Sequence, residues 1–490
     1  MSLTLGLSSA RSSLLVTGDQ TSVISRNIAN ADTPLYSRKS VQVVTVPGSG
    51  VRVSAVTRAE EPALFRSVLA ANSDSNTQSA LLESLDELNA TVNDVELDAS
   101  PAGLISKLVD AVQGYSAQPQ SKLAAEAAVR AARNLSDGLN SAATVVQNAR
   151  RDADTGLSSS VTRINSLLEQ FDGVNKQIIA GTRSGADITD YLDNRDKILQ
   201  DLSEHVGIRT VTRSDNDTVI YTDSGATLFE RDARTVEFKP SVSLTPGQPG
   251  NAIFIDGVAV TGSGATLPLQ SGRIVGLVQA RDEVGVSYER QLDEISRGLI
   301  SAFAESDQTG GGGEAPGLFT YSGASDVPAS GIVLDGLASR IRVNASVDPD
   351  QGGDATRLRD GGVADPSSTT YVYNSTGSAS YSDRLNEVIT KLTQAQSFDG
   401  AARLSTSASL TDYSASSVAW LQEARKVTDN EFQYRDTLFK RSSESHSKLT
   451  GVNIDEELAT LLELERSYQT SSKLISVIDN LYNTLISALG

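Results

Sequence analysis

Apolar side chains recur along the first thirty or so residues at alternating steps of four and three positions, and polar residues cover most of the remaining surface. The members of this seam are Leu3, Leu7, Ala10, Leu14, Thr17, Thr21, Ile24 and Ile28. A seven-residue repeat of this kind is typical of a helix that packs against another helix. Pro34 predicts the end of the helix, because proline removes a hydrogen-bond donor and favours an extended residue before it. Residues 41–58 then alternate around a proline–glycine turn, which predicts a hairpin.

The last forty or so residues carry a similar seam, again with steps of three and four. Its members are Ile454, Glu457, Leu461, Leu464, Tyr468, Ser471, Ile475, Ile478, Tyr482, Leu485 and Leu489. Asn453 or Asp455 can cap this helix, and Glu456 and Glu457 suit its first turn. Both ends of the chain therefore predict a helix with an apolar seam that little nearby sequence can cover.

The two terminal helices have opposite charge bias. Basic residues are in excess around the first helix, whereas the last one is acidic. Opposite net charge on two helices with apolar seams favours their packing against each other as a pair. The alternative is that each helix packs separately on the body of the protein, as ordinary amphipathic helices do.

Between the two ends, long helical patterns alternate with β-like segments. Residues 62–179 are patterned as helices with two breaks, and a helix from Ser121 to Ala180 would be about 90 Å long. Residues 206–268 contain short β-rich runs, with Asp256-Gly257 as the two-residue turn of a hairpin. Helix is expected again at 272–305, a second β module at 318–382, and helix at 385–446.

We therefore predict a mainly α chain with inserted β domains, in which paired coiled-coil-like terminal helices adjoin a long helical bundle and two outward β-rich modules. The expected domains are a terminal assembly domain (1–60 with 440–490), a bundle (61–205, 272–309 and 383–439), a β domain (206–271) and a variable module (310–382).

The amino-acid composition limits the partners, the chemistry and the location that we expect for the protein. The 490 residues include 42 Lys and Arg against 61 Asp and Glu, a net charge of −19 that makes nucleic acid an unexpected partner. The absence of cysteine excludes disulfides, thiolate metal sites and cysteine nucleophiles. No apolar run reaches about eighteen residues, so we expect no membrane insertion. The N-terminal pattern does not predict a Sec signal peptide, so export by another route is expected if the protein leaves the cell.

A search for chemistry predicts no catalytic, cofactor-binding or metal site. The two histidines, His205 and His446, stand in no metal-binding spacing. Residues 348–360 begin like a calcium loop with Asp348 and Asp350, but Arg359 occupies the position of the bidentate glutamate.

The stretch ISRNIANADTPLYSRKSV, residues 24–41, resembles the N-terminal signature of the axial proteins of the bacterial flagellum, the rod and hook family. That signature is Asn-Ile-Ala-Asn followed by Thr-x-Gly-Tyr. The matching residues are Asn27, Ile28, Ala29, Asn30, Thr33, Pro34 and Tyr36. Residues 451–486, 191–208 and 271–284 are similar to members at the hook–filament junction. Leu35 replaces the usual glycine, so it must either adopt a costly positive φ or change the turn.

The resemblance implies a structural adaptor that joins the hook to the filament through the next junction protein. Such a chain is exported by the flagellar type III apparatus to the extracellular flagellum, and its terminal helices order as it polymerises. The implied partners are further copies of the chain in a ring or helical tier, the hook protein, the second junction protein and an export chaperone at the C-terminal helix.

Assembly residues are predicted on both seams: Leu7, Leu14, Ile24, Ile28, Leu461, Leu464, Tyr468, Ile475, Ile478 and Tyr482. Another axial component, a secreted adhesin and an enzyme such as a wall hydrolase remain as alternatives.

Overall fold

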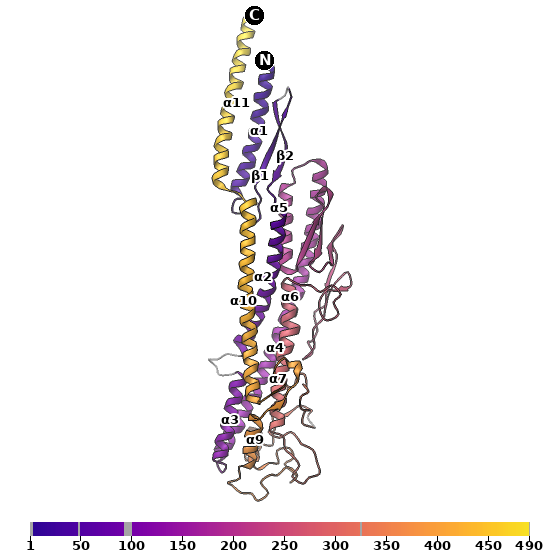
Figure 1. The fold of residues 1–490 in the computed structure, drawn as a ribbon, viewed down its shortest axis with the longest axis vertical. Coiled ribbons are helices and arrows are strands. Elements are labelled where there is room, and N and C mark those ends of the chain that lie inside the picture. Colours follow the sequence, from indigo (N-terminus) through magenta and orange to yellow (C-terminus); the bar gives the residue numbers. More distant parts are fainter. Residues whose placement is uncertain (1–2, 48–49, 93–99, 324–325, 490) are drawn as a thin grey trace.

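The computed structural model describes residues 3–47, 50–92, 100–323 and 326–489. The molecule is an elongated stack of helices in which α1 and α11 lie side by side at one end (Figure 1). The helices are α1 (Leu3–Ala29), α2 (Pro62–Val92), α3 (Pro101–Ala117), α4 (Lys122–Ser184), α5 (Thr189–His205), α6 (Arg273–Val278), α7 (Gly285–Ala302), α8 (Arg357–Asp360), α9 (Asp383–Thr393), α10 (Leu410–Thr450) and α11 (Ile454–Leu489). A mainly α fold with inserted β segments is therefore confirmed.

Helix α4 runs along most of the body. Its 63 residues give a length of about 95 Å at 1.5 Å per residue. The Ser121 side chain accepts a hydrogen bond from the Ala124 amide at the start, and Gly185 ends the helix with a φ of 71°. The predicted long helix is confirmed. Apolar side chains at steps of three and four, among them Ile164 and Phe171, bury one face against neighbouring elements.

Helices α2, α7 and α10 pack along the body with α4, and α3 and α9 lie at the end opposite α1 and α11 (Figure 1). A π-helical turn, Gln279–Val284, joins α6 to α7 without a break. This turn places Arg281 beside Asp154 of α4, with 2.5 Å between the guanidinium and the carboxylate. Both side chains are buried, so the pair ties α4 to the turn without exposing either charge.

The β domain packs on α4 and consists of two small antiparallel sheets. One holds β3 (Ile208–Thr212), β4 (Thr218–Thr222) and β5 (Thr227–Phe229) in that order, and the other holds β6 (Val236–Phe238), β7 (Ile253–Ile255) and β8 (Val258–Ala259). Asp256 and Gly257 both have positive φ in the turn between β7 and β8, so the predicted hairpin is confirmed.

The second β module contains less strand than its composition suggested. In the described part of residues 310–382, only β9 (Phe319–Tyr321) and β10 (Ile341–Val343) pair as strands. Asp354 and Asp365 instead accept hydrogen bonds from amides two residues further on, which favours turns over a ladder.

One expected helix was wrong. The helical stretch predicted at 385–446 is interrupted between α9 and α10 by the two-residue strands β11 (Gln396–Ser397) and β12 (Ser407–Ala408), before Ser409 caps α10. The predicted domain boundary at 440 falls inside α10, which continues to Thr450. His446 there packs on Phe65 of α2, with 5.6 Å between the ring centroids, so this turn of α10 belongs to the body.

The terminal unit consists of α1, α11 and a hairpin of β1 (Lys39–Val46) and β2 (Gly50–Arg58). Helix α1 contacts both α11 and the hairpin. The chain between α10 and α11 turns at Gly451, and the Asn453 side chain caps α11 by accepting hydrogen bonds from the Asp455 and Glu456 amides. The predicted hairpin and terminal cap are therefore present, and the two terminal helices pair with each other rather than packing separately on the body.

Candidate functional site

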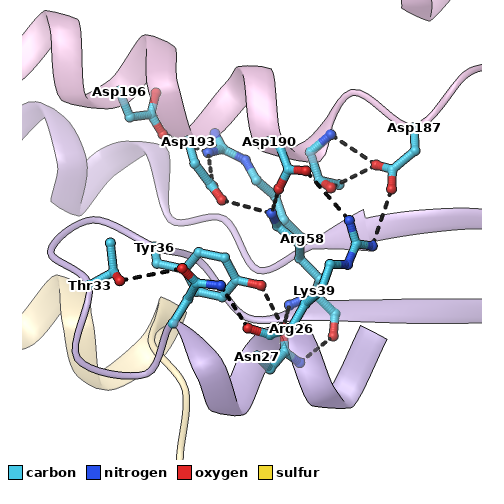
Figure 2. A network of polar contacts seen from close by, with 12 residues as sticks. Arg26, Asn27, Thr33, Tyr36, Lys39, Arg58, Asp187, Asp190, Asp193 and Asp196 are labelled. Atoms are coloured by element: carbon cyan, nitrogen blue, oxygen red, sulfur yellow. Dashed lines mark hydrogen bonds and ion pairs between the residues drawn. The ribbon is translucent and has the colours of Figure 1, made fainter. Parts of the chain in front are cut away.

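The motif of the N-terminal segment that contains Asn27 and Tyr36 lies at the base of the terminal unit, where α1, β1, α5 and α11 meet (Figure 2). Asn27 is fully buried there. Its amide nitrogen donates to the Lys39 carbonyl at 2.9 Å and to the Glu457 carboxylate at 3.0 Å. Its amide oxygen accepts from the Lys39 amide at 3.0 Å and from the Tyr36 hydroxyl at 3.1 Å. Both donors and both acceptor positions are used, which an aspartate or leucine could not reproduce.

Glu457 is the matching anchor on α11. Its carboxylate accepts hydrogen bonds from the side chains of Asn27 and Arg38 and is 1% exposed. The Arg38 amide also donates to the Thr450 carbonyl at 2.7 Å, at the end of α10. The loop after α1 is therefore joined to the end of one C-terminal helix and to the start of the next.

The loop itself is a series of turns with one strained residue. The Thr33 amide donates to the Asn30 carbonyl, and the Tyr36 amide donates to the Thr33 carbonyl. Leu35 has a φ of 60°, so leucine has adopted the left-handed conformation in place of the family's usual glycine. This conformation costs a non-glycine residue about 1–2 kcal/mol. Packing of the half-buried leucine against the hydrophobic cluster around α4 and α5 offsets part of that cost.

Two cations at the open end of the hairpin face the carboxylates of α5. Lys39 and Arg58 are directly opposite each other in the hairpin register. Two like charges in that arrangement destabilise an isolated hairpin. Here the Lys39 ammonium contacts Asp190 and lies 3.1 Å from Asp193, and Arg58 lies 3.0 Å from Asp193 and 2.8 Å from Asp196. We call Lys39, Arg58, Asp190, Asp193 and Asp196 the polar joint, because they connect the terminal unit to the body (Figure 2).

Burial makes the polar joint sensitive to the loss of any one charge. Burial alone would lower the pKa of Lys39, but the hydrogen bond to Asp190 and the charge of Asp193 raise it above its ordinary value. Burial also opposes the charge of Arg58, and Asp196 and Glu60 outweigh it, so the pKa of Arg58 is raised. Burial raises the pKa of Asp196 despite the nearby guanidiniums. Apart from Asp190, whose side chain is 70% exposed, each charge is therefore held in place by its partners rather than by water.

Helices α1 and α11 run antiparallel along a seam with one register. Asn27 contacts Glu457, the Ser13 and Ser471 hydroxyls lie 3.3 Å apart, and the Tyr482 hydroxyl lies 3.4 Å from that of Thr4. A side chain on Gly6 would touch Ile478. Small residues of α1 therefore face α11 and allow a close approach of the two backbones.

The predicted assembly residues occupy this seam and its flanks to different degrees. Ile24 and Ile478 are buried, whereas Tyr468 is 47% exposed. The others are half-buried: Leu7, Leu14, Ile28, Leu461, Leu464, Ile475 and Tyr482. The sequence interpretation missed Gly6 and Ser13, because a search for apolar heptads passes over small residues. It also missed the polar joint, whose signal is the spacing of Asp190, Asp193 and Asp196 by three along α5.

The rejected calcium loop has a different role. The carboxylates of Asp348 and Asp350 contact the guanidinium of Arg133 on α4. Within the described ranges no cluster of three metal-ligating side chains occurs. No helix in the described part of the chain is long and apolar enough to cross a membrane.

Two family models match the chain. One is described as the flagellar hook-associated protein FlgK helical domain and matches residues 82–317, and the other is described as the flagellar basal body rod FlgEFG protein C-terminal and matches residues 446–488. Together they cover more than half of the chain. Flagellar hook-associated protein 1 of Bacillus subtilis (strain 168) is 20% identical over 99% of this chain and 98% of that protein.

The chain belongs to the flagellar hook-associated protein 1 family. Flagellar hook-associated protein 1 of Salmonella typhimurium is 22% identical over 61% of this chain and 54% of that protein, and the Escherichia coli (strain K12) protein is 22% identical over 54% and 48%. A solved structure, the flagellar hook junction protein FlgK from Burkholderia pseudomallei, is 21% identical over 52% of this chain and 46% of that chain, with a TM-score of 0.42.

Membership in the hook-associated protein 1 family makes this chain a structural component of the flagellum and not an enzyme. The resemblance stated from the N- and C-terminal motifs is confirmed. The rod-type C-terminal match covers α11 and therefore includes Glu457. The Asn27 motif lies outside both family models. Its hydrogen bond to Glu457 links it to the segment that the rod-type C-terminal model matches.

Proposed function

We propose that this chain is an adaptor that joins the flagellar hook to the filament, and that it polymerises through α1 and α11. The observation that carries the proposal is the exposed apolar surface of α11. Among the described residues, 23 large apolar side chains are exposed, and nine of them lie on this one helix of 36 residues. Exposed apolar surface at this density is typical of a surface that another protein covers.

Helix α11 has too few neighbours in one chain. It packs along α1 from Glu457 to Tyr482, and no other element of the described chain packs against it to a similar extent (Figure 1). A long helix gains most of its stability from packing rather than from its own hydrogen bonds. Further copies of the chain, the hook protein and the second junction protein are the partners that supply this packing at the junction.

The polar joint gives the adaptor a firm connection between assembly and body. The terminal unit forms the assembly domain, the bundle forms the strut, and the two β-containing segments lie outward. Contact forces on α11 pass to α5 through Glu457, Asn27 and Lys39, which are linked by the contacts described above.

Helix α11 is expected to take part in export as well as in assembly. The chain leaves the cell through the flagellar type III apparatus, and an export chaperone covers α11 before assembly. An exposed apolar helix aggregates if left uncovered, so a soluble partner for α11 inside the cell fits its surface. The mature location is the extracellular hook–filament junction.

Removal of the gene tests the adaptor function. Cells without this chain are expected to assemble hooks that end without filaments, as seen by electron microscopy, and to stop swimming. Expression of the chain from a plasmid should restore both filaments and swimming. Normal filaments and normal swimming in the deletion strain would contradict the adaptor function and favour the adhesin alternative.

A further inference from the structure

A cavity of about 470 Å³ lies next to the polar joint, where α2, α5, β3 and the end of α10 come together. Arg58 and Asp196 of the polar joint form part of its wall. The rest of the wall includes Phe65, Arg66, Arg195, Leu199, Thr210 and His446. A cavity of this volume is large enough for a small ligand or for a side chain of another protein.

Arg195 of α5 belongs to the wall of this cavity and is 7% exposed. Its Nη1 atom donates to the Asn216 carbonyl at 2.7 Å, whereas its buried Nε atom has no hydrogen-bond partner in the described part of the chain. Among the described residues, no carboxylate forms an ion pair with this guanidinium. Because a guanidinium has five N–H donors in a planar fork that fits a carboxylate, Arg195 retains donors for an anion.

Arg58, which lines the same cavity, has the opposite balance of charge. It contacts Asp193, Asp196 and Glu60. Burial opposes the charge of Arg58, but Asp196 and Glu60 outweigh burial and raise its pKa. For Arg195, burial outweighs the charge of Asp196 and lowers the pKa below its ordinary value. The folded chain therefore compensates one guanidinium of the wall and leaves the other without a sufficient counter-charge.

The other carboxylates of the wall do not supply this counter-charge. Glu60 lies 2.8 Å from Arg58, and Asp196 also lies 2.8 Å from Arg58, so both carboxylates already have a cationic partner. Glu61 and Arg66 are both exposed at the start of α2 and carry opposite charges. The uncompensated buried charge of the wall therefore remains on α5.

We propose that this cavity binds a carboxylate group on a short apolar stem, with Arg195 as its cationic partner. The carboxylate accepts hydrogen bonds from the guanidinium, and the stem lies against Phe65 and Leu199. The Thr210 hydroxyl is a further donor in the wall. Since the ligand pairs a buried charge, it stabilises the folded chain. The site consists of residues of the body and does not depend on the proposed adaptor function.

Ligand-detected NMR on the purified full chain tests the site with butyrate as the probe. Butyramide is the matched control, because it has the same stem and a neutral head. A dissociation constant of about 1–10 mM is expected for butyrate, given its small size. Butyramide should bind at least tenfold more weakly, since it cannot pair the charge of Arg195. Equal binding of the two probes would overturn the proposal.

A substitution assigns the binding to Arg195. Arg195→Gln should weaken butyrate binding at least tenfold, and butyrate should raise the melting temperature of the parent chain but not of this variant. Arg213→Gln is the matched control, because Arg213 is exposed, pairs with Glu230 and lies outside the wall of the cavity. Unchanged butyrate binding in Arg195→Gln would contradict the proposal. The comparison of butyrate with butyramide needs no variant, so it decides the proposal even if Arg195→Gln fails to fold.

Two sources of the carboxylate are separated by a second pair of probes. The peptide acetyl-Ala-Glu-Ala-amide carries the carboxylate on a polypeptide, and acetyl-Ala-Gln-Ala-amide is its neutral counterpart. Displacement of butyrate by the glutamate peptide alone would support the site and identify a glutamate side chain of a partner protein as its ligand. Binding of butyrate without displacement by either peptide would support the site with a free small carboxylate as its ligand. Absence of binding by butyrate and by both peptides would refute the site and leave the adaptor function untouched.

Discussion

Asn27 and Glu457 are 430 positions apart in the chain and share a buried hydrogen bond of 3.0 Å. The bond joins the last turns of the first helix to the first turn of the last one. The Asn27 side chain also donates a hydrogen bond to the Lys39 backbone carbonyl and accepts one from the Lys39 backbone amide. One side chain therefore fixes the relative position of α1, β1 and α11, the three elements that form the terminal unit.

Replacement of Asn27 by alanine should loosen the terminal unit. The change leaves the buried Lys39 backbone without its side-chain partner and removes one of the hydrogen bonds to Glu457, at an expected cost of about 2–4 kcal/mol. Limited proteolysis, with cleavage sites read by mass spectrometry, should show faster cutting of the first fifty and last forty or so residues. Asn30→Ala is the matched control, because its amide nitrogen donates only to the nearby Arg26 carbonyl. Equal protection of both variants would contradict the role of Asn27.

Loss of the Arg58 charge should strongly lower the free energy of unfolding. Arg58→Ala removes a cation from between Asp193 and Asp196, and an unpaired buried carboxylate costs about 3–5 kcal/mol. Urea unfolding measures the change. Asp196→Asn, added to Arg58→Ala, should recover a large part of the loss because the unpaired charge is gone. Arg52→Ala, exposed on the same strand, should change stability by no more than about 0.5 kcal/mol.

Two substitutions at Leu35 test the left-handed conformation of this residue. Leu35→Gly relieves the strain but loses half-buried packing, so its net effect should stay within about 1 kcal/mol. Leu35→Val should destabilise by about 2 kcal/mol or more, since a β-branched residue is poorly accommodated at a φ of 60°. Thermal melting orders the variants. A valine variant as stable as leucine would mean that the turn changes shape.

Acid should weaken the body through His205. Burial, together with the charges of Arg163 and Arg273, lowers the pKa of His205 to about 4, against an ordinary value of 6.5. Because the folded state needs the neutral ring, its contribution is fully present above pH 6.5 and is lost as the pH falls towards 4. Urea unfolding at pH 7 and pH 4.5 should show a smaller drop for His205→Gln than for the parent chain. Equal drops would assign the acid sensitivity to other groups.

Periodic elements and the pairing of the two terminal helices could be predicted from the sequence, and the individual residue contacts between elements could not. The 63 residues of α4 show their seam along the whole helix, and the hairpin at Asp256-Gly257 follows from local turn chemistry. The polar joint depends on Lys39, Arg58 and Asp193, which come from three separate segments. Each residue alone is an ordinary surface charge in an acidic chain, so only the fold reveals that they meet.

The α1 seam shows a second limit of sequence patterns. The heptad pattern predicted Leu7 and Leu14 as the residues of α1 that contact another helix. Gly6 and Ser13 make the observed contacts with α11. Close packing of two helices is achieved with small residues, and hydrophobicity does not detect them. The excess of apolar side chains on α11 was visible in the sequence, but the number of them that stay exposed in the folded chain required the structure.

Incorporation of Ile475→Asp into flagella tests the central claim most directly. Ile475 belongs to the α11 seam, and a carboxylate there should prevent the assembly of α1 and α11 without reaching the body. The amount of chain in purified hook–filament particles should fall at least tenfold, while the melting of the body stays within about 2 °C of the parent. Ser476→Asp, on the exposed neighbouring residue, should incorporate normally. Normal incorporation of Ile475→Asp would contradict assembly through the terminal helices.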